Sequence, residues 1–354
     1  MLMSERFQRW AAAFPLTRPV VRHHERALFD LCAGFIYSQA LLAAVRLRLF
    51  ETLSNGPLAE AEIAARVAVP QENLRRLLRA LAALDLLAER GRGVYGLSVR
   101  GAALAGNPGV IAMIQHHSAL YADLHDPVAL LKSEGGGGRL AAYWGYAGNG
   151  DPGELTENDV AAYSVLMAAS QQAIAEEILR SYSFQRHRCL MDVGGGEARF
   201  ISAAARRVPR LELMLFDLPA VVARARTALA AEGLAGRVRV HGGSFLERLP
   251  TGADVITLIR ILLDHDDETA LRILRSARAA LPAGGTVIVA EPMSGVRGAE
   301  PVAPYFGLYL LAMGRGRPRT PTELKALMES VGFSRVRYRH TGRPLLVSLL
   351  VGHA

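Results

Sequence analysis

The stretch Cys189–Asp217, CLMDVGGGEARFISAAARRVPRLELMLFD, decides the fold. Its apolar run Leu190–Val193 predicts a buried strand, and three glycines follow at once. The Ala-rich stretch Phe200–Val208 predicts a helix, and Leu211–Phe216 predicts a second strand that ends in an acid. Strand, glycine turn, helix, strand and acid in this order are typical of a nucleotide-binding βαβ unit.

The residues around the glycines indicate which nucleotide is bound. Gly194 and Gly196 fit the first two positions of the dinucleotide pattern G-x-G-x-x-G, but Arg199 occupies the third. Asp192, just before the glycines, favours a cationic or amine-bearing ligand over a pyrophosphate. Asp217 can accept hydrogen bonds from both ribose hydroxyls. The pattern therefore predicts S-adenosylmethionine (SAM), and the alternative is a glycine turn with only a structural role.

Composition limits the class of protein. A chain of 354 residues has room for two domains and a large core. The net charge of +8, mostly from arginine, is compatible with nucleic acid, with an anionic membrane or with no specific partner. We expect no membrane-spanning run and no secretory signal in MLMSERFQRW. Cys32 and Cys189 lie far apart without metal-ligand spacing, which predicts a reducing, cytoplasmic setting.

The N-terminal part predicts a mostly helical winged-helix domain. Residues 5–24 are expected to form an irregular arm, and Phe29–Phe50 a helix so apolar that part of it should be a subunit interface. Ala61–Val67 and Gln71–Leu87 predict two helices, and Ala88–Leu97 a hairpin after them. The alternative roles are DNA binding through the second helix and a purely structural one. The nucleotide-binding unit that follows favours the structural role.

Strands and helices alternate after the opening stretch. This alternation predicts an α/β fold with a Rossmann-like, doubly wound, mainly parallel sheet and helices on both faces. We expect further strands at Val238–His241, Val255–Leu262 and Thr286–Glu291, helices at Pro219–Ala231, Asp266–Leu281 and Thr320–Val331, and a terminal strand pair at Arg335–Tyr338 and Leu345–Val351. Ligands in such sheets lie at the carboxyl ends of the strands, where the glycines, Asp217, Ser244, Phe245, Arg260 and Glu291 all fall.

The region between the two predicted domains supplies candidate substrate contacts. We expect domain boundaries at residues 1–105, 106–183 and 184–354, with the middle segment helical. His116 and His117 are adjacent, but without other ligands at suitable spacing they indicate pocket or interface residues rather than a metal site. The four glycines 135–138 predict a flexible surface loop. The helix expected over Glu157–Ser183 carries Tyr163, Met167 and Ser170 on one face.

Several motifs in order resemble one family. They are RRLLRALAALDLL at 75–87, VYGLSVRG at 94–101, LMDVGGG at 190–196, FDLP at 216–219, GGSF at 242–245, RILLDHDDE at 260–268 and GGTVIVAEP at 284–292. Together they resemble the SAM-dependent O-methyltransferases that join a winged-helix dimerisation domain to a Rossmann-like domain. Within that family, AAYWGYAG at 141–148 and YFGLYLLAMGRGRPRT at 305–320 are most similar to the carotenoid O-methyltransferases of purple phototrophic bacteria.

The resemblance implies a cofactor, a substrate class and a set of site residues. It implies SAM, with S-adenosylhomocysteine (SAH) as product, no metal and no nucleic acid. It also implies a homodimer, cytoplasmic with peripheral membrane contact, that methylates the tertiary C1 hydroxyl of an acyclic carotenoid. The cofactor residues expected are Asp192, Gly194, Gly195, Gly196, Asp217, Leu218, Ser244, Phe245 and Arg260. The substrate residues expected are Met113, His117, Tyr143, Trp144, Met167, Tyr305, Tyr309 and Met313.

The chain departs from the family at the general base. The family's His-Asp-Trp is replaced by Leu263-Asp264-His265, so a leucine fills the usual base position. In extended backbone, residues two apart point to the same side, which lets His265 reach the site from a shifted place. We therefore predict His265 as the base, with Glu291 in support, and a loop histidine without a catalytic role is the alternative.

The chemistry is compatible with this change. The SAM sulfonium already carries an activated methyl group, and an aliphatic alcohol is too weak an acid to ionise before it attacks. The base need only take the proton as the C–O bond forms. Three other functions stay open: methylation of a phenolic, polyketide or bacteriochlorophyll-precursor hydroxyl, SAM binding with lost or altered chemistry, and transcriptional regulation by the winged helix.

Overall fold

The structure, a computed structural model, describes residues 4–133, 135–143 and 157–354. It divides into two compact units, Met1–Gln115 and His116–Ala354, which are described separately below. The boundary lies ten residues beyond the predicted end of the first domain. The predicted three-part division, with a middle segment over 106–183, stays a prediction.

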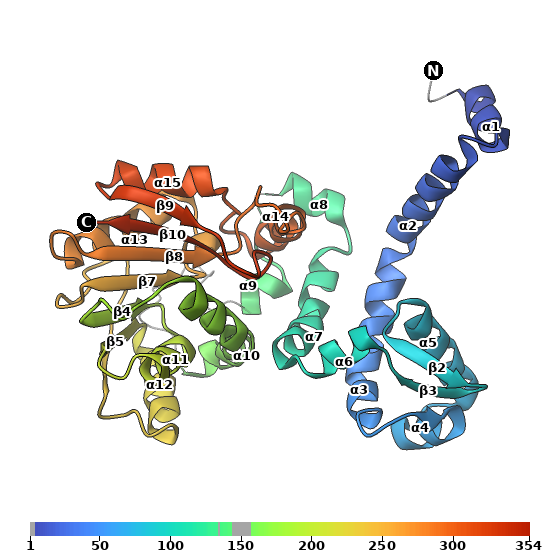
Figure 1. Ribbon diagram of the computed structural model, residues 1–354, viewed down its shortest axis with the longest axis horizontal. Coiled ribbons are helices and arrows are strands. Elements are labelled where there is room, and N and C mark those ends of the chain that lie inside the picture. The colour runs from blue at the N-terminus through green and yellow to red at the C-terminus, as the bar shows by residue number, and fades with distance from the viewer. Residues whose placement is uncertain (1–3, 134, 144–156) are drawn as a thin grey trace. The chain divides into compact units, whose positions relative to one another are not determined.

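The first unit begins with two helices where an irregular arm was expected. Helices α1 (Glu5–Ala13) and α2 (Arg18–Arg46) include almost all of residues 5–24, so that prediction was wrong (Figure 1). The prolines do not break α2 because Pro19 occupies its first turn, where a missing N–H is harmless. Arg48, at φ +53°, separates α2 from the short helix α3 (Leu49–Thr52).

The rest of the first unit is the predicted winged helix. Helices α4 (Glu60–Val67) and α5 (Gln71–Ala83) precede the hairpin of β2 (Leu87–Gly91) and β3 (Val94–Leu97). A short strand, β1 (Leu58–Ala59), completes an antiparallel sheet of order β1-β3-β2. Helices α6 (Val99–Ala105) and α7 (Pro108–Asp123) follow, and α7 contains the boundary between the units.

Helix α2 is exposed over most of its length. Only its last turns are buried in the unit, through Leu42, Ala44 and Val45. Leu31 and Phe35 are 78% and 67% exposed, as expected for a helix that meets another surface. Contrary to the expectation from sequence, α2 is long and apolar enough to cross a membrane, and among the described helices it is the one that is. Length and composition alone support that possibility.

The second unit contains a seven-stranded sheet of the predicted kind. The strand order is β6-β5-β4-β7-β8-β10-β9, with the first five strands parallel and β10 and β9 antiparallel to their neighbours (Figure 1). The strands are β4 (Cys189–Val193), β5 (Glu212–Asp217), β6 (Val238–Gly242), β7 (Val255–Ile259), β8 (Thr286–Glu291), β9 (Ser334–Arg339) and β10 (Ser348–His353). Their helices are α8 (Pro127–Lys132), α9 (Arg139–Tyr143), α10 (Glu157–Ser181), α11 (Arg199–Arg207), α12 (Pro219–Ala231), α13 (Asp267–Ala280), α14 (Val302–Met313) and α15 (Pro321–Ser330).

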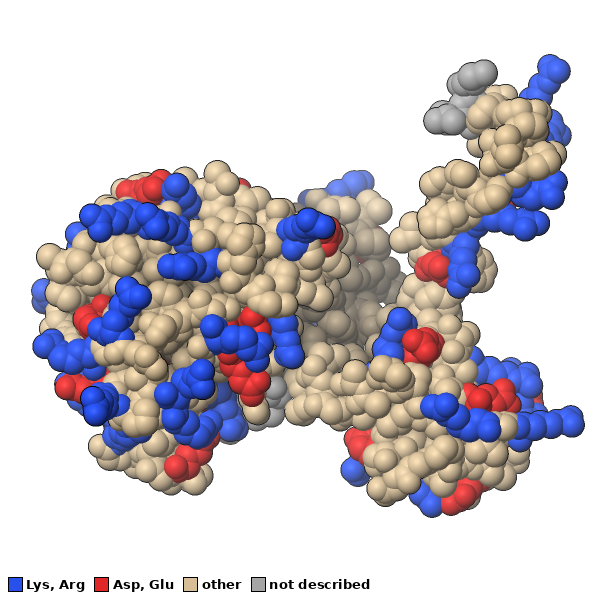
Figure 2. All heavy atoms as spheres, viewed as in Figure 1, with Lys and Arg blue, Asp and Glu red and all other residues tan. Residues whose placement is uncertain are grey.

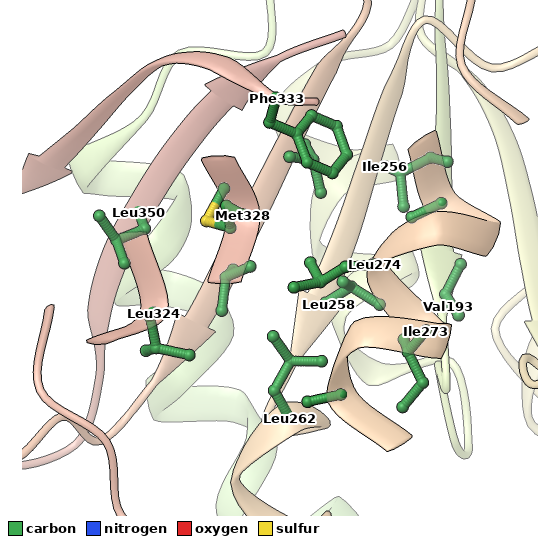
Figure 3. Packing of buried hydrophobic residues seen from close by; sticks show 14 of the residues in the cluster. Val193, Ile256, Leu258, Leu262, Ile273, Leu274, Leu324, Met328, Phe333 and Leu350 are labelled. Carbon is green, nitrogen blue, oxygen red and sulfur yellow. The ribbon is translucent and has the colours of Figure 1, made fainter. Parts of the chain in front are cut away.

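Helices cover both faces of the sheet because its strands are apolar on both sides. On one face, α13 and α15 pack on alternate strand residues such as Val193, Ile256 and Leu258 (Figure 3). On the other face, α10, α11 and α12 pack on the intervening residues, among them Leu190 and Leu215. This double covering fixes the strand ends where the predicted site lies.

Two local differences from the expected structure bear on that site. Strand β7 ends at Ile259, earlier than predicted, and Leu262–Asp264 form a 3₁₀ turn, η3. Leu263 and His265 therefore do not lie two apart on an extended segment, contrary to the expectation from sequence. In addition, Gly135 and Gly136, two of the four glycines predicted to form a flexible loop, pack on the end of α14, where a Cβ on Gly314 would lie 2.6 Å from the Cα of Gly136.

Candidate active site

The glycine turn after β4 leaves room for a ligand. Gly194 has φ +70°, a conformation that residues with a Cβ adopt only with strain, and a Cβ there would meet the end of the Ile261 side chain at 2.3 Å. A Cβ on Gly195 would meet Leu215 at 2.9 Å. Above Gly196, at φ +54°, no described atom would lie within 4 Å of a Cβ. The turn thus presents bare backbone to open space at the carboxyl edge of the sheet.

Asp217 is held at the end of β5 by that same turn. Its two carboxylate oxygens accept hydrogen bonds from the backbone N–H groups of Gly196, at 2.8 Å, and Leu218, at 2.7 Å. Burial raises the pKa of Asp217 to about 6, although both backbone hydrogen bonds oppose the rise. The predicted cofactor residues Gly196, Asp217 and Leu218 therefore do come together.

Asp192 lies beside them in β4 and is also buried. The hydroxyl of Thr257 on the neighbouring strand β7 donates to its carboxylate at 2.7 Å. Burial raises the pKa of Asp192 to about 7, the hydroxyl bond opposes the rise, and the charge of Asp217 adds to it. Two buried acids near one turn are stabilised as carboxylates by a cation. SAM supplies such a cation, so these residues fit it.

Ser244 and Phe245 follow β6 at the same edge of the sheet. The Ser244 hydroxyl accepts a hydrogen bond from the backbone N–H of Leu246, at 3.3 Å, which forms a local turn. The ring of Phe245 meets the imidazole of His265 edge-on, with centroids 5.5 Å apart. The predicted base thus lies beside a predicted cofactor residue.

Arg260 joins the sheet edge to α10. Its backbone adopts φ +55°, and its N–H donates to the carbonyl of Ala290 at 2.8 Å. Its guanidinium donates to the hydroxyl of Ser170 at 2.9 Å. Burial raises the pKa of both Asp264 and Tyr305, and the positive charge of Arg260 offsets part of each rise. A direct contact of Arg260 with the cofactor stays a prediction.

Arg319 holds the loop after β7 and was not predicted from the sequence. Its side chain is 0% exposed and donates to the carbonyls of Leu262, at 2.6 Å, and His265, at 2.7 Å. It also donates to the carboxylate of Asp267 at 2.8 Å. Nothing in GRGRPRT distinguishes this arginine from its solvated neighbours. Leu263, at the family's base position, packs instead into an apolar cluster with Tyr309.

Three titratable groups lie around this loop. Glu291 ends β8, is 1% exposed, and neither carboxyl oxygen finds a hydrogen-bond partner among the described residues. Burial raises its pKa to about 8, the charge of Arg319 opposes the rise, and that of Asp264 adds to it. Burial likewise raises the pKa of Asp264 to about 7. Burial, followed by the charge of Arg315, lowers the pKa of His265 to about 4, so its ring is neutral at neutral pH.

Aromatic and histidine side chains pair between α7 and α14. The imidazole of His117 is 2.7 Å from the hydroxyl of Tyr305, and that of His116 is 2.8 Å from the hydroxyl of Tyr309. The two tyrosine rings stack with centroids 5.8 Å apart. Burial lowers the pKa of His116 to about 4 and raises that of Tyr305 to about 12, so both groups are neutral. Met313 is buried in the same cluster.

The other predicted substrate residues lie elsewhere in the chain or outside the described part of it. Met167 is half-buried on α10, and Met113 belongs to the first unit. Trp144 and the side chain of Tyr143 lie outside the described residues. Within the described ranges, no group of three or more His, Cys, Asp or Glu could hold a metal.

Comparison with known proteins defines the class. Residues 121–334 match the model of the O-methyltransferase domain, and residues 29–106 match that of the O-methyltransferase dimerisation domain. The first match covers more than half of the chain, so the chain belongs to the O-methyltransferase family. It is a SAM-dependent O-methyltransferase, and its dimerisation domain supports a homodimer.

Particular relatives are similar over nearly the whole length. The demethylspheroidene O-methyltransferase of Cereibacter sphaeroides is 45% identical over 98% of this chain and 91% of its own. That of Rhodobacter capsulatus is 39% identical over 98% of this chain and 87% of its own. Among solved structures, the SAH-bound form of CalO1, a methyltransferase in calicheamicin biosynthesis, matches with a TM-score of 0.78 and 31% identity over 93% of this chain and 98% of that one.

Proposed function

We propose that this protein transfers the methyl group of SAM to the tertiary C1 hydroxyl of an acyclic carotenoid. The observation that carries the proposal is the similarity, over 98% of the chain, to two proteins named demethylspheroidene O-methyltransferase. The cluster of Tyr305, Tyr309 and Met313 supports it, because neutral, largely apolar side chains suit a long hydrocarbon. We further propose that Met113, Tyr143, Trp144 and Met167 contribute to the same substrate channel.

The residues of the chain that hold the cofactor are those of the glycine turn. When bound, SAM supplies a methyl group activated by its sulfonium. Gly196 leaves open space at the turn, which permits close approach of the cofactor. The N–H groups of Gly194 and Gly195 donate to the carbonyl of Phe216, so these two glycines contribute the shape of the turn rather than hydrogen-bond donors. Asp217 accepts hydrogen bonds from the ribose hydroxyls in this proposal. Asp192 supplies negative charge beneath the turn. Ser244, Phe245 and Arg260 complete the proposed cofactor site from the neighbouring strand ends.

The proton of the hydroxyl goes to His265 in this proposal. Its neutral imidazole has a free lone pair at neutral pH, and a weak base is sufficient because the oxygen becomes strongly acidic as the new C–O bond forms. Glu291, which holds its own proton below about pH 8, would act as a hydrogen-bond donor rather than as a second base. Placing the hydroxyl correctly supplies much of the remaining acceleration.

A turnover assay with a panel of acceptors tests the proposal. Purified protein and labelled SAM are incubated with detergent-dispersed 1-hydroxycarotenoids, with phenols and with polyketides, and the products are read by mass. A gain of one methyl group on the 1-hydroxycarotenoid alone is expected. Methylation of a phenol or polyketide alone would keep the class and reject the substrate. SAM binding without any product would indicate that the protein does not catalyse methyl transfer, because Leu263 stands where the family has its histidine base.

A further inference from the structure

Helix α1 has one aromatic face and one polar face. Phe7, Trp10 and Ala11 share one face of the helix at the i, i+3, i+4 spacing, and Phe14 directly follows its last residue. The ring of Trp10 lies 5.8 Å from that of Phe7 and stacks on that of Phe14 at 5.2 Å. Trp10 is nevertheless 52% exposed. The opposite face carries the exposed side chains of Glu5, Arg6, Gln8 and Arg9.

The same two-sided character continues into α2. Arg18, Arg22 and Arg26 recur every four residues, and Leu16 and Val20 are 80% and 56% exposed. Residues 4–26 contain five arginines and only two glutamates, which gives them a net charge of +3. In Figure 2 the arginine atoms of α1 and α2 gather mostly along one side of these helices, beside a surface without charged atoms.

The connection between the helices is fixed rather than loose. The hydroxyl of Thr17 donates to the carbonyl of Ala11 at 2.6 Å, and the guanidinium of Arg18 donates to that of Ala13 at 2.9 Å. The turn therefore holds the aromatic face of α1 and the first turns of α2 as one element. Farther along, α2 enters the core of the first unit, so its C-terminal end is not available to a bilayer.

This element lies outside the part matched as a dimerisation domain. That match begins at residue 29, after the last of the three spaced arginines. The element is therefore separate from the matched dimerisation domain.

We propose that residues 4–26 are a membrane-docking segment that lies in the surface of an anionic lipid bilayer. Tryptophan and phenylalanine on one face with arginine on the other is the composition of helices that lie in the headgroup region. Arginines near the surface add attraction to anionic headgroups. A second copy of the chain is the competing occupant of the aromatic face, and the oligomeric state of the variants measured below distinguishes it from the bilayer.

The docking segment deepens the proposed function, on which its biological purpose rests. A carotenoid dissolves in the bilayer and not in water, so an enzyme that acts on it gains access to substrate by lying at the membrane surface. The docking itself requires no substrate and no turnover. A binding assay therefore tests the segment separately from the reaction.

Binding of the full chain to lipid vesicles is the test. The wild type is mixed with vesicles of phosphatidylglycerol and phosphatidylcholine, or of phosphatidylcholine alone, and the bound fraction is measured by flotation. Two double variants are compared: Arg6→Gln with Arg9→Gln, and Trp10→Ser with Phe14→Ser. Matched controls remove two exposed arginines from α13, Arg272→Gln with Arg275→Gln, and two exposed apolar residues from α8, Val128→Ser with Leu131→Ser.

The segment predicts a distinct result for each variant. Loss of the two arginines should weaken binding to the anionic vesicles about tenfold or more, and high salt should have the same effect. Loss of the two aromatic residues should weaken binding by a similar factor and leave sedimentation of the dimer unchanged. The controls should bind as the wild type does. Equal binding by all variants would overturn the proposal. Conversion of the Trp10→Ser, Phe14→Ser variant to monomers would also overturn it, because the aromatic face would then belong to the contact with the partner subunit.

Discussion

The carboxyl group of Glu291 gives stability a pH dependence that one substitution removes. The side chain is 1% exposed without a hydrogen-bond partner among the described residues, so its ionised form is strongly disfavoured in the folded protein. Glu291→Gln keeps the shape of the side chain and removes the ionisation. The comparison of the two proteins across pH therefore isolates the free energy of one buried charge.

The sign and size of the change in the free energy of unfolding follow from the raised pKa of Glu291. The pKa of Glu291 rises from 4.5 to about 8 because of burial, so between these values the unfolded chain has lost a proton that the folded chain keeps. The free energy of unfolding then falls by about 1.4 kcal/mol for each pH unit. Between about pH 5.5 and pH 8 the fall amounts to about 3 kcal/mol, and below pH 4.5 the full stability is present.

Denaturant unfolding of the cofactor-free protein measures this change. Midpoints are compared at about pH 5.5 and pH 8 at one fixed protein concentration, because the chain forms dimers. The glutamine variant should lose about 3 kcal/mol less than the wild type over this range. Glu329→Gln is the control, since Glu329 is exposed at the end of α15. Parallel pH profiles for wild type and Glu291→Gln would refute the reasoning.

Three further predictions concern the cofactor, the base and the glycine loop. Asp217→Asn should weaken SAM binding about tenfold or more in calorimetry, and wild-type affinity should fall as pH drops below about 6, where its carboxylate is protonated. His265→Ala should lower turnover at least about a hundredfold with SAM binding unchanged, and near-normal turnover would reject it as the base. In denaturant unfolding, Gly314→Ala should cost about 1–3 kcal/mol more stability than Gly233→Ala. Both glycines have positive φ, but only the methyl group at position 314 would meet backbone atoms. Equal losses in the two would exclude the contact with Gly136 as the cause.

The sheet and its ligand edge could be predicted from sequence because the signals are local. The strand, glycines, helix and acid of Cys189–Asp217 occupy one continuous stretch, and each depends on its immediate neighbours. The aromatic face of α14 was likewise predicted from the spacing of Tyr305, Tyr309 and Met313. A terminal strand pair was also predicted at the end of the chain, but the antiparallel direction of its strands was not.

The features that the sequence did not predict depend on distant parts of the chain. Arg319 is buried among three acceptors, two from the loop after β7 and one from the start of α13, and no pattern near residue 319 indicates them. The turn over Leu262–Asp264 replaced an expected strand because Arg260, with φ +55°, ends the extended backbone. Residues 5–24 are largely helical rather than irregular because Pro19 lies in the first turn of α2, where proline starts a helix instead of breaking it.

The way in which Arg319 holds its loop has a consequence for how such enzymes diverge. Two of its three acceptors are the backbone carbonyls of residues 262 and 265, which every amino acid possesses. Replacement of the side chains at 263, 264 or 265 leaves those acceptors in place. A proton acceptor can therefore be lost at one position of the loop and gained at another while the loop keeps its path. The arginine therefore allows the side chains at these three positions to change while the backbone of the loop stays in place.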